Sequence, residues 1–523
     1  MALIFGDSAG RHDYNNFLGN RIAYVITIRT SFKPCIDVVD PTTRLFLGRI
    51  TAAVNEQYGQ CNMIKLPSPY TDVGGYAEAL LTFIDNPLFR QITGDIHVND
   101  ALIHDAWGAL PPEWTGWWSS VPDHRQVQQN LIDSIDESIA GPPAILSDQK
   151  HQANSPLQGR PASLTRWLEA MQSLSLPRLQ QFRCGVDLPV CLTDRMKTKK
   201  IDEVSTAVAY IRGVCQANDI TRIIDMGSGQ GYLSVSLAFL FPDLKVLAID
   251  GSEAQLAASR AAAASLDLPE QRIKHMRRYI DGSPTLSEEL TAWADGEKCM
   301  LVGLHACGNL SEHMLRYFAT VPCITQLGAV GCCYNHIVPR SASCPEGFPI
   351  SQKMRAKDVK LSATALMTGC QAPNNWEKPD LSKEESGYSR RRFYRAILEK
   401  IFHDKGIELD KDNRPIWGVR KGDLSNFRVY AHRVIDCLGV DRGRVPDSEL
   451  DAYEGRYRDC NGKIAILWTL SVMCCKVVES VIAVDRYLFL TESGATGVEV
   501  LPIFDYKVSP RNLMLIASKS TPK

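Results

Sequence analysis

One stretch constrains the fold of this chain more than any other, the run from Arg222 to Ser234, which reads RIIDMGSGQGYLS. It opens with an apolar run that ends in an acid, Asp225, and continues with glycines at every second position, Gly227, Gly229 and Gly231. An amphipathic run follows at once, so the pattern predicts a strand, a tight glycine turn and a helix. Glycines let the backbone approach a ligand closely, and the first N–H groups of the helix point to the same place.

An acid also ends the next predicted strand, Lys245–Ile249, where Asp250 is followed by Gly251. An acid at this position can accept hydrogen bonds from both hydroxyls of a ribose. The glycine spacing, D-x-G-x-G-x-G, differs from the dinucleotide fingerprint G-x-G-x-x-G. It resembles the first motif of the Rossmann-like methyltransferases that use S-adenosylmethionine (SAM). We therefore predict SAM as the cofactor, with another nucleotide or an ordinary strand–turn–helix as the alternatives. The predicted cofactor-binding residues are Asp225, Gly227, Ser228, Gly229, Gly231, Asp250 and Gly251.

Composition limits the class of protein. The chain has 523 residues, more than one ordinary domain needs, and a formal net charge of -1, so any nucleic-acid binding has to use local basic patches. Its 16 cysteines are scattered, which is typical of reduced intracellular thiols. The first residues lack the pattern of a signal peptide, and the longest apolar stretch, Ile464–Cys475, is too short to span a bilayer. We expect an intracellular protein, cytoplasmic or nuclear, that binds no membrane.

Polar and sulfur-containing residues follow two further predicted strands. The run Met300–Leu304 reads as a buried strand, and Gln326–Asn335 reads as the next one. In an open α/β sheet, ligands bind outside the carboxyl ends of the strands, so the residues there should converge beside the glycine turn and the methyl group of SAM. The predicted catalytic residues are His305, as a general base, with Cys307 and Asn335.

The same convergence has two alternative interpretations. His305, Cys307, Cys332 and Cys333 could ligate a metal ion, although their spacing matches no zinc module and adjacent cysteines rarely bind one ion. The cysteines could also fill a packed pocket as small apolar side chains. The spacing favours no bound metal.

Strands return only near the end of the chain. A Rossmann-like methyltransferase sheet has seven strands, and five are predicted before residue 336. The short apolar runs Val498–Leu501 and Leu513–Ser518 have the right length to close the sheet as an antiparallel pair. The predicted fold is therefore an α/β class I methyltransferase sheet with a helical N-terminal region and a helical insertion. The predicted regions are residues 1–195, mostly helical, 196–340, the SAM-binding core, 341–490, the mostly helical insertion, and 491–523, the closing strands.

Helical periodicity is predicted at several other places. The predicted helices outside the glycine motif are Gly74–Phe83, Val127–Ile139, Ile201–Ala217, Ser252–Leu266, Leu310–Ala319, Lys360–Gly369, Arg391–Ile401, Asn426–Leu438 and Ile464–Leu490. Loops are predicted for residues 141–143, 148–161, 336–352 and 371–390. The tryptophan-rich stretch Leu110–Trp118 favours a packing interface over a base-stacking surface.

Basic residues gather in two places near the predicted core. They are Lys197, Lys199 and Lys200 before the glycine motif, and Arg277 and Arg278 near the end of the third predicted strand, Ile273–Tyr279. They could meet the phosphates of RNA. A solvated helix start explains the lysines equally well.

Taken together, several short motifs resemble the methyltransferase-like protein 25 family, some members of which are called ribosomal RNA adenine dimethylase domain-containing proteins. The resemblance covers roughly residues 105 to 520 and includes the lysine-rich segment Met196–Lys200. The motifs are Asp225–Ser234, Leu304–Leu310, Gly331–Asn335, Gly347–Ser351, Gly369–Gln371 and Leu501–Asp505 through Ser509–Leu513. The resemblance implies a class I SAM-dependent methyltransferase. This sequence has Asn309 where the family pattern has Asp.

The His-x-Cys-Gly and Cys-Cys elements are also similar to those of eukaryotic tRNA 2′-O-methyltransferases that act on the acceptor stem. Adenine N6 methylation usually uses an Asn/Asp-Pro-Pro-Tyr/Phe tetrapeptide, where this chain has His305–Gly308. That difference argues against adenine N6 chemistry. We predict a SAM-dependent methyltransferase acting on RNA, either tRNA or rRNA. The alternatives are a protein methyltransferase and a SAM-binding or metal-binding scaffold without turnover.

Overall fold

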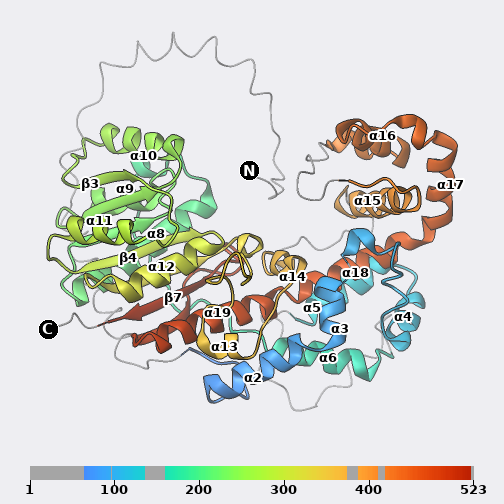
Figure 1. Ribbon diagram of the computed structural model, residues 1–523, viewed down its shortest axis with the longest axis horizontal. Helices are drawn as coiled ribbons and strands as arrows, with labels where there is room; N and C mark the ends of the chain where they lie inside the picture. Colours follow the sequence, from blue (N-terminus) through green and yellow to red (C-terminus); the bar gives the residue numbers. More distant parts are fainter. Residues whose placement is uncertain (1–63, 96, 136–158, 374–386, 410–418, 520–523) are drawn as a thin grey trace, which may run out of the picture. The chain divides into compact units, whose positions relative to one another are not determined.

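A computed structural model describes residues 64–95, 97–135, 159–373, 387–409 and 419–519 (Figure 1). The loops predicted for residues 141–143 and most of 148–161 lie outside these ranges. A seven-stranded sheet has the order β3-β2-β1-β4-β5-β7-β6, in which β7 runs antiparallel to both of its neighbours. The predicted methyltransferase sheet with a closing antiparallel pair is confirmed. The strands are β1 Arg222–Met226, β2 Lys245–Asp250, β3 Ile273–Arg277, β4 Cys299–Ala306, β5 Ile324–Gly331, β6 Thr496–Pro502 and β7 Leu513–Ser518.

Parallel pairing places the ends of β1, β2, β4 and β5 at one edge of the sheet. Strand β1 pairs with β2 on one side and with β4 on the other, and β4 pairs with β5. The prediction that β5 continues to Asn335 is wrong. It ends at Gly331, because the chain turns into the short 3-10 helix η3, Tyr334–His336, where the Tyr334 N–H donates to the Cys332 carbonyl oxygen at 2.8 Å.

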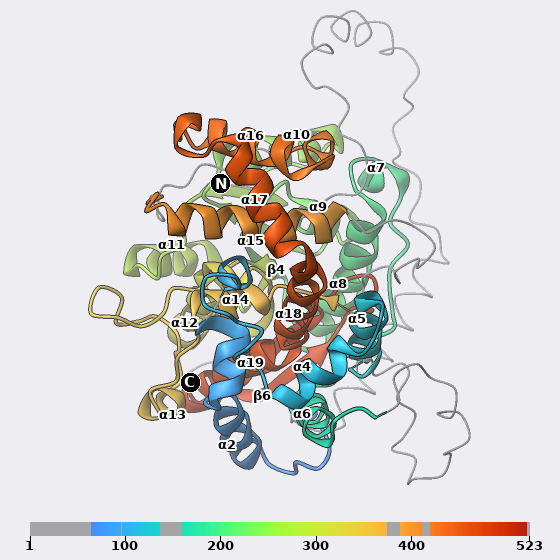
Figure 2. The ribbon, with the colours of Figure 1, turned by 90° about the vertical axis from the view of Figure 1, so that its right-hand side faces the viewer.

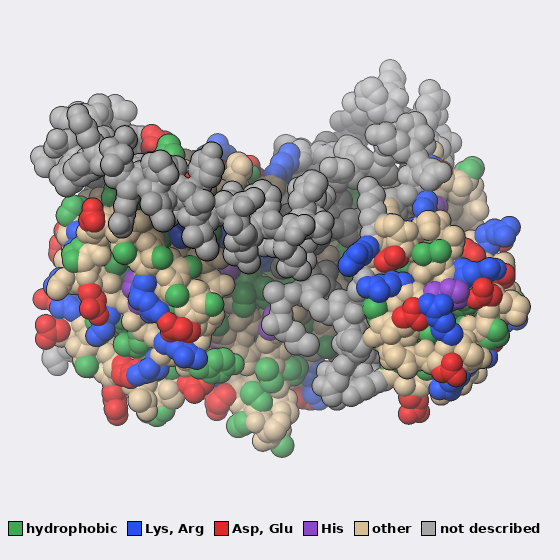
Figure 3. Space-filling view, turned by 90° about the horizontal axis from the view of Figure 1, so that it is seen from above, with side chains coloured by type: hydrophobic (Ala, Val, Ile, Leu, Met, Phe, Trp, Pro, Cys, Tyr) green, Lys and Arg blue, Asp and Glu red, His purple; other side chains and the backbone are tan. Residues whose placement is uncertain are grey.

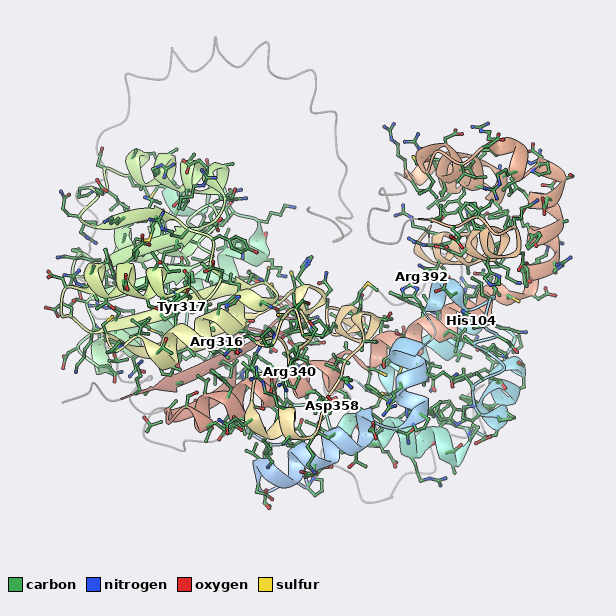
Figure 4. All side chains as sticks on the ribbon, in the orientation of Figure 1. His104, Arg316, Tyr317, Arg340, Asp358 and Arg392 are labelled. Atoms are coloured by element: carbon green, nitrogen blue, oxygen red, sulfur yellow. The ribbon has the colours of Figure 1, made fainter. Side chains whose placement is uncertain are left out.

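Helices cover the parallel strands β1, β2, β4 and β5, which explains why these strands read as nearly continuous apolar runs, whereas the edge strand β3 is only partly buried. Helix α12 packs against β4 and β5, α10 against β3, and α9 against β2 (Figure 1). Figure 2 shows the same ribbon turned by 90° about the vertical axis. The helices around this part of the sheet are α8 Thr198–Ala217, α9 Tyr232–Leu240, α10 Glu253–Ser265, α11 Pro284–Ala294 and α12 Asn309–Thr320. Arg316 of α12, labelled in Figure 4, pairs with Glu346 at 2.8 Å and lies over the ring of Phe489. This helix therefore also contacts the insertion.

The helical N-terminal region contributes aromatic side chains to the core. Trp114 and Trp118 are 1% and 2% exposed, and the Trp114 ring lies 5.5 Å from that of Trp167. The packing role predicted for this stretch is confirmed. Helix α5 begins earlier than predicted and ends at Asp133, and helix α6 was not predicted. The elements here are α2 Val73–Ile84, α3 Pro87–Arg90, η1 Gln91–Asp95, η2 Val98–Asp100, α4 Pro112–Ser119, α5 His124–Asp133, α6 Ala162–Ser173 and α7 Val190–Thr193.

Residues 341–490, predicted as a mostly helical insertion, contain helices whose ends differ from the predicted ones. The helix predicted over Ile464–Leu490 is two helices, because the Cys474 N–H bonds to the Ser471 carbonyl oxygen at 3.2 Å and closes the first of them. The loop predicted through Arg390 gives way to a helix at Gly387, and the predicted helix Lys360–Gly369 is shorter. The elements are α13 Gln352–Ala356, α14 Ala363–Thr368, α15 Gly387–Asp404, η5 Lys421–Leu424, α16 Phe427–Cys437, η6 Arg442–Arg444, α17 Asp447–Tyr457, η7 Arg458–Cys460, α18 Asn461–Met473 and α19 Cys475–Glu492.

One buried cluster runs through the N-terminal helices, the sheet, α18 and α19, and a second lies among α15, α16 and α17. The boundaries predicted at residues 195, 340 and 490 stay predictions.

Within the described residues, the run Asp447–Glu492 is long and apolar enough for a membrane span by composition, but 89% of its most apolar window is buried in the protein. A core helix passes the same test, so this run is weak evidence for a membrane span.

Candidate functional site

The glycine turn after β1 adopts a backbone that favours glycine. Gly227, Gly229 and Gly231 have φ values of 74°, 54° and 77°, in the left-handed region. The N–H groups of Gly227 and Ser228 donate to the Ile249 carbonyl oxygen at 2.9 and 3.0 Å, which ties the turn to the end of β2. A Cβ atom on Gly231 would lie 2.0 Å from the Ser259 hydroxyl oxygen. The turn therefore keeps this backbone only with glycine at Gly231, where a side chain would collide with Ser259.

Two acids hold the turn. Asp250 accepts the Gly229 N–H at 2.9 Å through one carboxylate oxygen and the Ser252 N–H at 2.8 Å through the other. Asp225 is 2% exposed and accepts a hydrogen bond from the Ser234 hydroxyl. Burial, with help from the Asp250 charge, raises the pKa of Asp225 to about 7. Asp225 therefore anchors the turn from inside, and Asp250 presents its carboxylate at the loop surface.

The turn fits a nucleoside cofactor with an anionic group. The Ser228 hydroxyl is buried and has no hydrogen-bond partner among the described residues. Helix α9 has no side-chain cap, so its first N–H groups can bind a carboxylate. A Cβ atom on Gly251 would lie 3.6 Å from the ring of Tyr279, which is 82% exposed after β3. The exposed Tyr279 ring therefore lies next to the residue that follows Asp250. It was not predicted as a site residue, because one aromatic side chain in a loop carries no signal of its own.

His305 occupies the end of β4 with a strained backbone, φ 62°. Its Nε2 atom lies 2.9 Å from a carboxylate oxygen of Glu203, which is 1% exposed on α8. Glu203 also accepts hydrogen bonds from Lys200 at 2.6 Å and from the Ser509 hydroxyl at 2.7 Å. Burial alone would raise the pKa of Glu203, but the bonds from His305 and Lys200 outweigh it and hold the pKa below its usual range. His305 is thus held by an ionised carboxylate.

Glu203 is a candidate functional residue that was not predicted from the sequence. It precedes His305 by 102 positions and joins α8, β4 and the loop before β7 through its three partners. In the sequence, Glu203 would stand out only as a carboxylate at a buried position of the helix Ile201–Ala217. Helical periodicity alone did not separate Glu203 from the charged residues on the exposed face of that helix.

Three cysteine sulfurs meet at the ends of β4 and β5. The Sγ atom of Cys307 lies 3.1 Å from that of Cys332 and 3.3 Å from that of Cys333, and the last two are 3.4 Å apart. The predicted convergence of these cysteines is correct. His305 is not part of the group, since its ring bonds to Glu203, so the four-ligand set proposed from the sequence does not form. Hydrogen bonding between the Cys307 sulfur and those of Cys332 and Cys333 holds the pKa of the Cys307 thiol below its usual range.

Asn335 is exposed. Its side-chain oxygen accepts a hydrogen bond from the Cys370 thiol at 3.3 Å. Its predicted catalytic role stays a prediction. Asn309, at the position where the family pattern has Asp, accepts the Val338 N–H at 2.8 Å through its side-chain oxygen. A carboxylate would accept the same bond, so this substitution keeps the local structure.

Several of the predicted RNA-binding residues pair with acids. Lys199 and Lys200 pair with Glu203 at 3.7 and 2.6 Å, and Arg278 pairs with Glu289 at 2.5 Å. The side chains of Lys197 and Arg277 are exposed. The lysine-rich segment lies beside the glycine turn, because the Tyr232 hydroxyl of α9 donates to the Arg195 carbonyl oxygen at 3.0 Å. Basic and acidic side chains are interspersed on the face seen in Figure 3.

Comparison with known proteins agrees with this geometry. Residues 196–340 match the family described as "Methyltransferase domain". The chain is 28% identical over 233 residues to the human "Probable methyltransferase-like protein 25", and 28% identical over 234 residues to the mouse protein of that name. Each match covers 43% of this chain and 38% of the relative, so the chain aligns with well under half the length of these proteins. A solved structure of coclaurine N-methyltransferase bound to N-methylheliamine and SAH aligns over 85% of this chain and 98% of that one, with 10% identity and a TM-score of 0.22, which is too low to support any argument.

Residues 196–340 are thus a class I methyltransferase domain. The cofactor-binding roles of the glycine turn, Asp225 and Asp250 stay predictions. The domain implies SAM as its cofactor. The adenine dimethylase name borne by some members of the related family stays part of the resemblance alone.

Proposed function

We propose that this chain is a SAM-dependent methyltransferase that methylates RNA, either tRNA or rRNA, and uses His305 as its general base. The observation that carries the proposal is the hydrogen bond of 2.9 Å between Glu203 and His305. It lies at the end of β4, the strand that pairs directly with β1 ahead of the glycine turn. This pairing supports a proton acceptor near the glycine turn, where we propose that the methyl donor binds.

The Glu203 contact decides which nitrogen of His305 acts. An ionised carboxylate only accepts hydrogen bonds, so His305 Nε2 donates, and in the neutral ring Nδ1 is left to accept a proton. Bound SAM supplies the methyl group. His305 takes the proton that an attacking hydroxyl or amine must lose, and Glu203 stabilises the ring when it becomes charged. In this scheme Glu203 is a positioning residue.

The basic segment ahead of α8 supports RNA as the substrate. The hydrogen bond from Tyr232 to Arg195 places this segment at the first turn of α9, next to the cofactor loop. Phosphate contacts at this point would orient a strand over the end of β4. The net charge of -1 means that such contacts act locally, without long-range attraction.

A labelling experiment tests the proposal. The full-length protein is incubated with SAM carrying a tritiated methyl group, together with cellular RNA or with cellular protein. We expect label that nuclease releases and protease does not. Label that resists nuclease and yields to protease would establish a protein methyltransferase instead. SAM binding measured by calorimetry, without any labelled product, would establish a scaffold.

The role of Glu203 is tested in the same assay. Glu203→Gln keeps the size of the side chain but removes the charge, so we expect kcat to fall by on the order of 10²-fold while the Kd for SAM stays unchanged. Glu399→Gln is the matched control, because Glu399 is a buried helical acid, 6% exposed, in the insertion. Equal losses in both variants, or an unchanged kcat in Glu203→Gln, would remove Glu203 from the mechanism.

A further inference from the structure

We propose that Cys307, Cys332, Cys333 and Cys370 form a zinc site at the ends of β4 and β5. The first three sulfur atoms already lie within 3.4 Å of one another. With Zn–S bonds of about 2.3 Å, thiolates at the corners of a tetrahedron are about 3.8 Å apart. Each sulfur therefore has to move outward by only a few tenths of an ångström to hold the ion.

The register of the sheet brings the ligands together. Ala306 of β4 pairs with Gly331 of β5, so Cys307 and Cys332 are the next residues on two neighbouring strands. The Gly308 N–H donates to the Cys333 carbonyl oxygen at 3.2 Å and fixes the two strand ends to each other. The cluster is thus a consequence of backbone pairing and does not depend on flexible loops.

Adjacent cysteines can share an ion here because they are not in a strand. Successive side chains of a strand point to opposite faces. Strand β5 ends at Gly331, and the turn into η3 leaves the sulfurs of Cys332 and Cys333 on the same side, 3.4 Å apart. Cys332 and Cys333 can therefore both bind one ion, although they are adjacent in the sequence.

The fourth ligand comes from the segment after α14. The Cys370 thiol lies 3.3 Å from the Asn335 side-chain oxygen and 3.8 Å from the Cys332 carbonyl oxygen. It lies outside the group of three sulfurs that are within 4.8 Å of one another, so its side chain has to turn toward them to complete the ligand set. The carbonyl groups on both sides of Cys370, those of Gly369 and Gln371, each accept a hydrogen bond of 2.6 Å from Arg511, which is 7% exposed. A buried arginine thus holds the chain in place around this cysteine.

Packing alone does not account for this arrangement. A cysteine that serves as a small apolar side chain is buried, whereas Cys307 is an exposed residue. An all-sulfur ligand set selects a soft metal in tetrahedral geometry, and zinc is the common occupant of such sites. The site would join β4, β5 and the segment that follows α14.

Elemental analysis of the full-length protein, purified in reducing buffer without chelator and dialysed against zinc, tests the proposal. We expect about one zinc per chain, which Cys307→Ser and Cys370→Ser both lose. Cys191→Ser is the matched control, since Cys191 is an exposed thiol outside the group, and this variant should retain the metal. Zinc retained equally in all variants, or no metal with all four thiols reactive toward a thiol reagent, would overturn the proposal.

A cobalt-substituted protein provides a second readout that does not require the variants to fold. Co²⁺ bound by several thiolates gives a strong sulfur-to-metal absorption in the near ultraviolet, and zinc should displace it. Absence of this band after cobalt loading would contradict a sulfur site. Neither measurement uses methyl transfer, so its outcome is independent of the proposed enzyme activity.

Discussion

Two regions at the carboxyl edge of the sheet differ in how far apart in the sequence their residues lie. We call them the glycine end, which is the turn from Gly227 to Gly231 with Asp250, and the cysteine end, which is the group of Cys307, Cys332, Cys333 and Cys370. At the glycine end, the turn and Asp250 that holds it lie within one continuous stretch, and the bond from Gly229 to Asp250 spans 21 positions. At the cysteine end, Cys370 comes from the insertion, and the segment around it is held by Arg511, about 140 positions further along the chain. A site made from one local unit can be read from sequence, whereas a site made where distant segments meet depends on how the whole chain packs. Four predictions test this contrast, from the largest effect to the smallest.

Removal of the last two strands should have the largest effect, although it leaves the glycine motif intact. Truncation after Thr491 removes β6 and β7, which cover the edge of β5 through backbone pairing. It also removes Ser509 and Arg511, the partners of Glu203 and of the segment around Cys370. We expect loss of soluble expression or of SAM binding, measured by yield and by calorimetry. A fragment that folds and binds SAM normally would show that the glycine end is independent of the rest.

A side chain at Gly231 should disrupt the glycine end alone. Gly231→Val places a Cβ atom 2.0 Å from the Ser259 hydroxyl oxygen at a φ of 77°. We expect a loss of about 1–3 kcal/mol in the free energy of unfolding, measured by denaturant titration, together with loss of SAM binding. Gly494→Val is the matched control, because Gly494 has a φ of 78° and a Cβ atom there meets nothing within 4 Å. If both variants behave alike, backbone strain is the cause and the contact with Ser259 is not.

Loss of the Asp250 carboxylate should weaken the cofactor site without unfolding the protein. Asp250→Ala removes a charged acceptor, worth roughly 1.5–3 kcal/mol, or about tenfold to a hundredfold in SAM affinity. The measurement is calorimetric titration with SAM. An unchanged affinity in a folded variant would show that this acid does not contact the cofactor.

The last prediction is a pH dependence of stability that arises from Asp225. Its pKa is raised to about 7 in the folded protein, mainly by burial, above the usual value of 3.8. Between these two values the folded state binds a proton that the unfolded state has lost, so stability should fall as pH rises from about 4 to 7. Asp225→Asn should flatten this part of the curve of unfolding free energy against pH. A curve of the same slope in the variant would assign the dependence to other acids, such as Glu312, whose pKa burial also raises to about 7.

The sequence predicted the seven strands to within a few residues, and most of them are apolar runs buried on both faces. The predicted boundaries of helices differ more from the structure. Cys474 divides a continuous apolar run into α18 and α19, and residues 387–390, which read as polar loop, are helical. At Cys474 the boundary is set by a backbone hydrogen bond that periodicity does not record.

The sequence by itself determined the fold class and the cofactor loop. Glycine conformations and a nearby acid are local properties, so the left-handed backbone of Gly227, Gly229 and Gly231 and the bond from Gly229 to Asp250 form where the pattern predicts a turn. Only the tertiary structure decided which partners His305 and the clustered cysteines have. Glu203 reaches His305 because α8 packs beside the end of β4, and Cys307 meets Cys332 because β4 and β5 pair in one register. These contacts join positions far apart in the chain, so their partners are fixed only when the whole core packs.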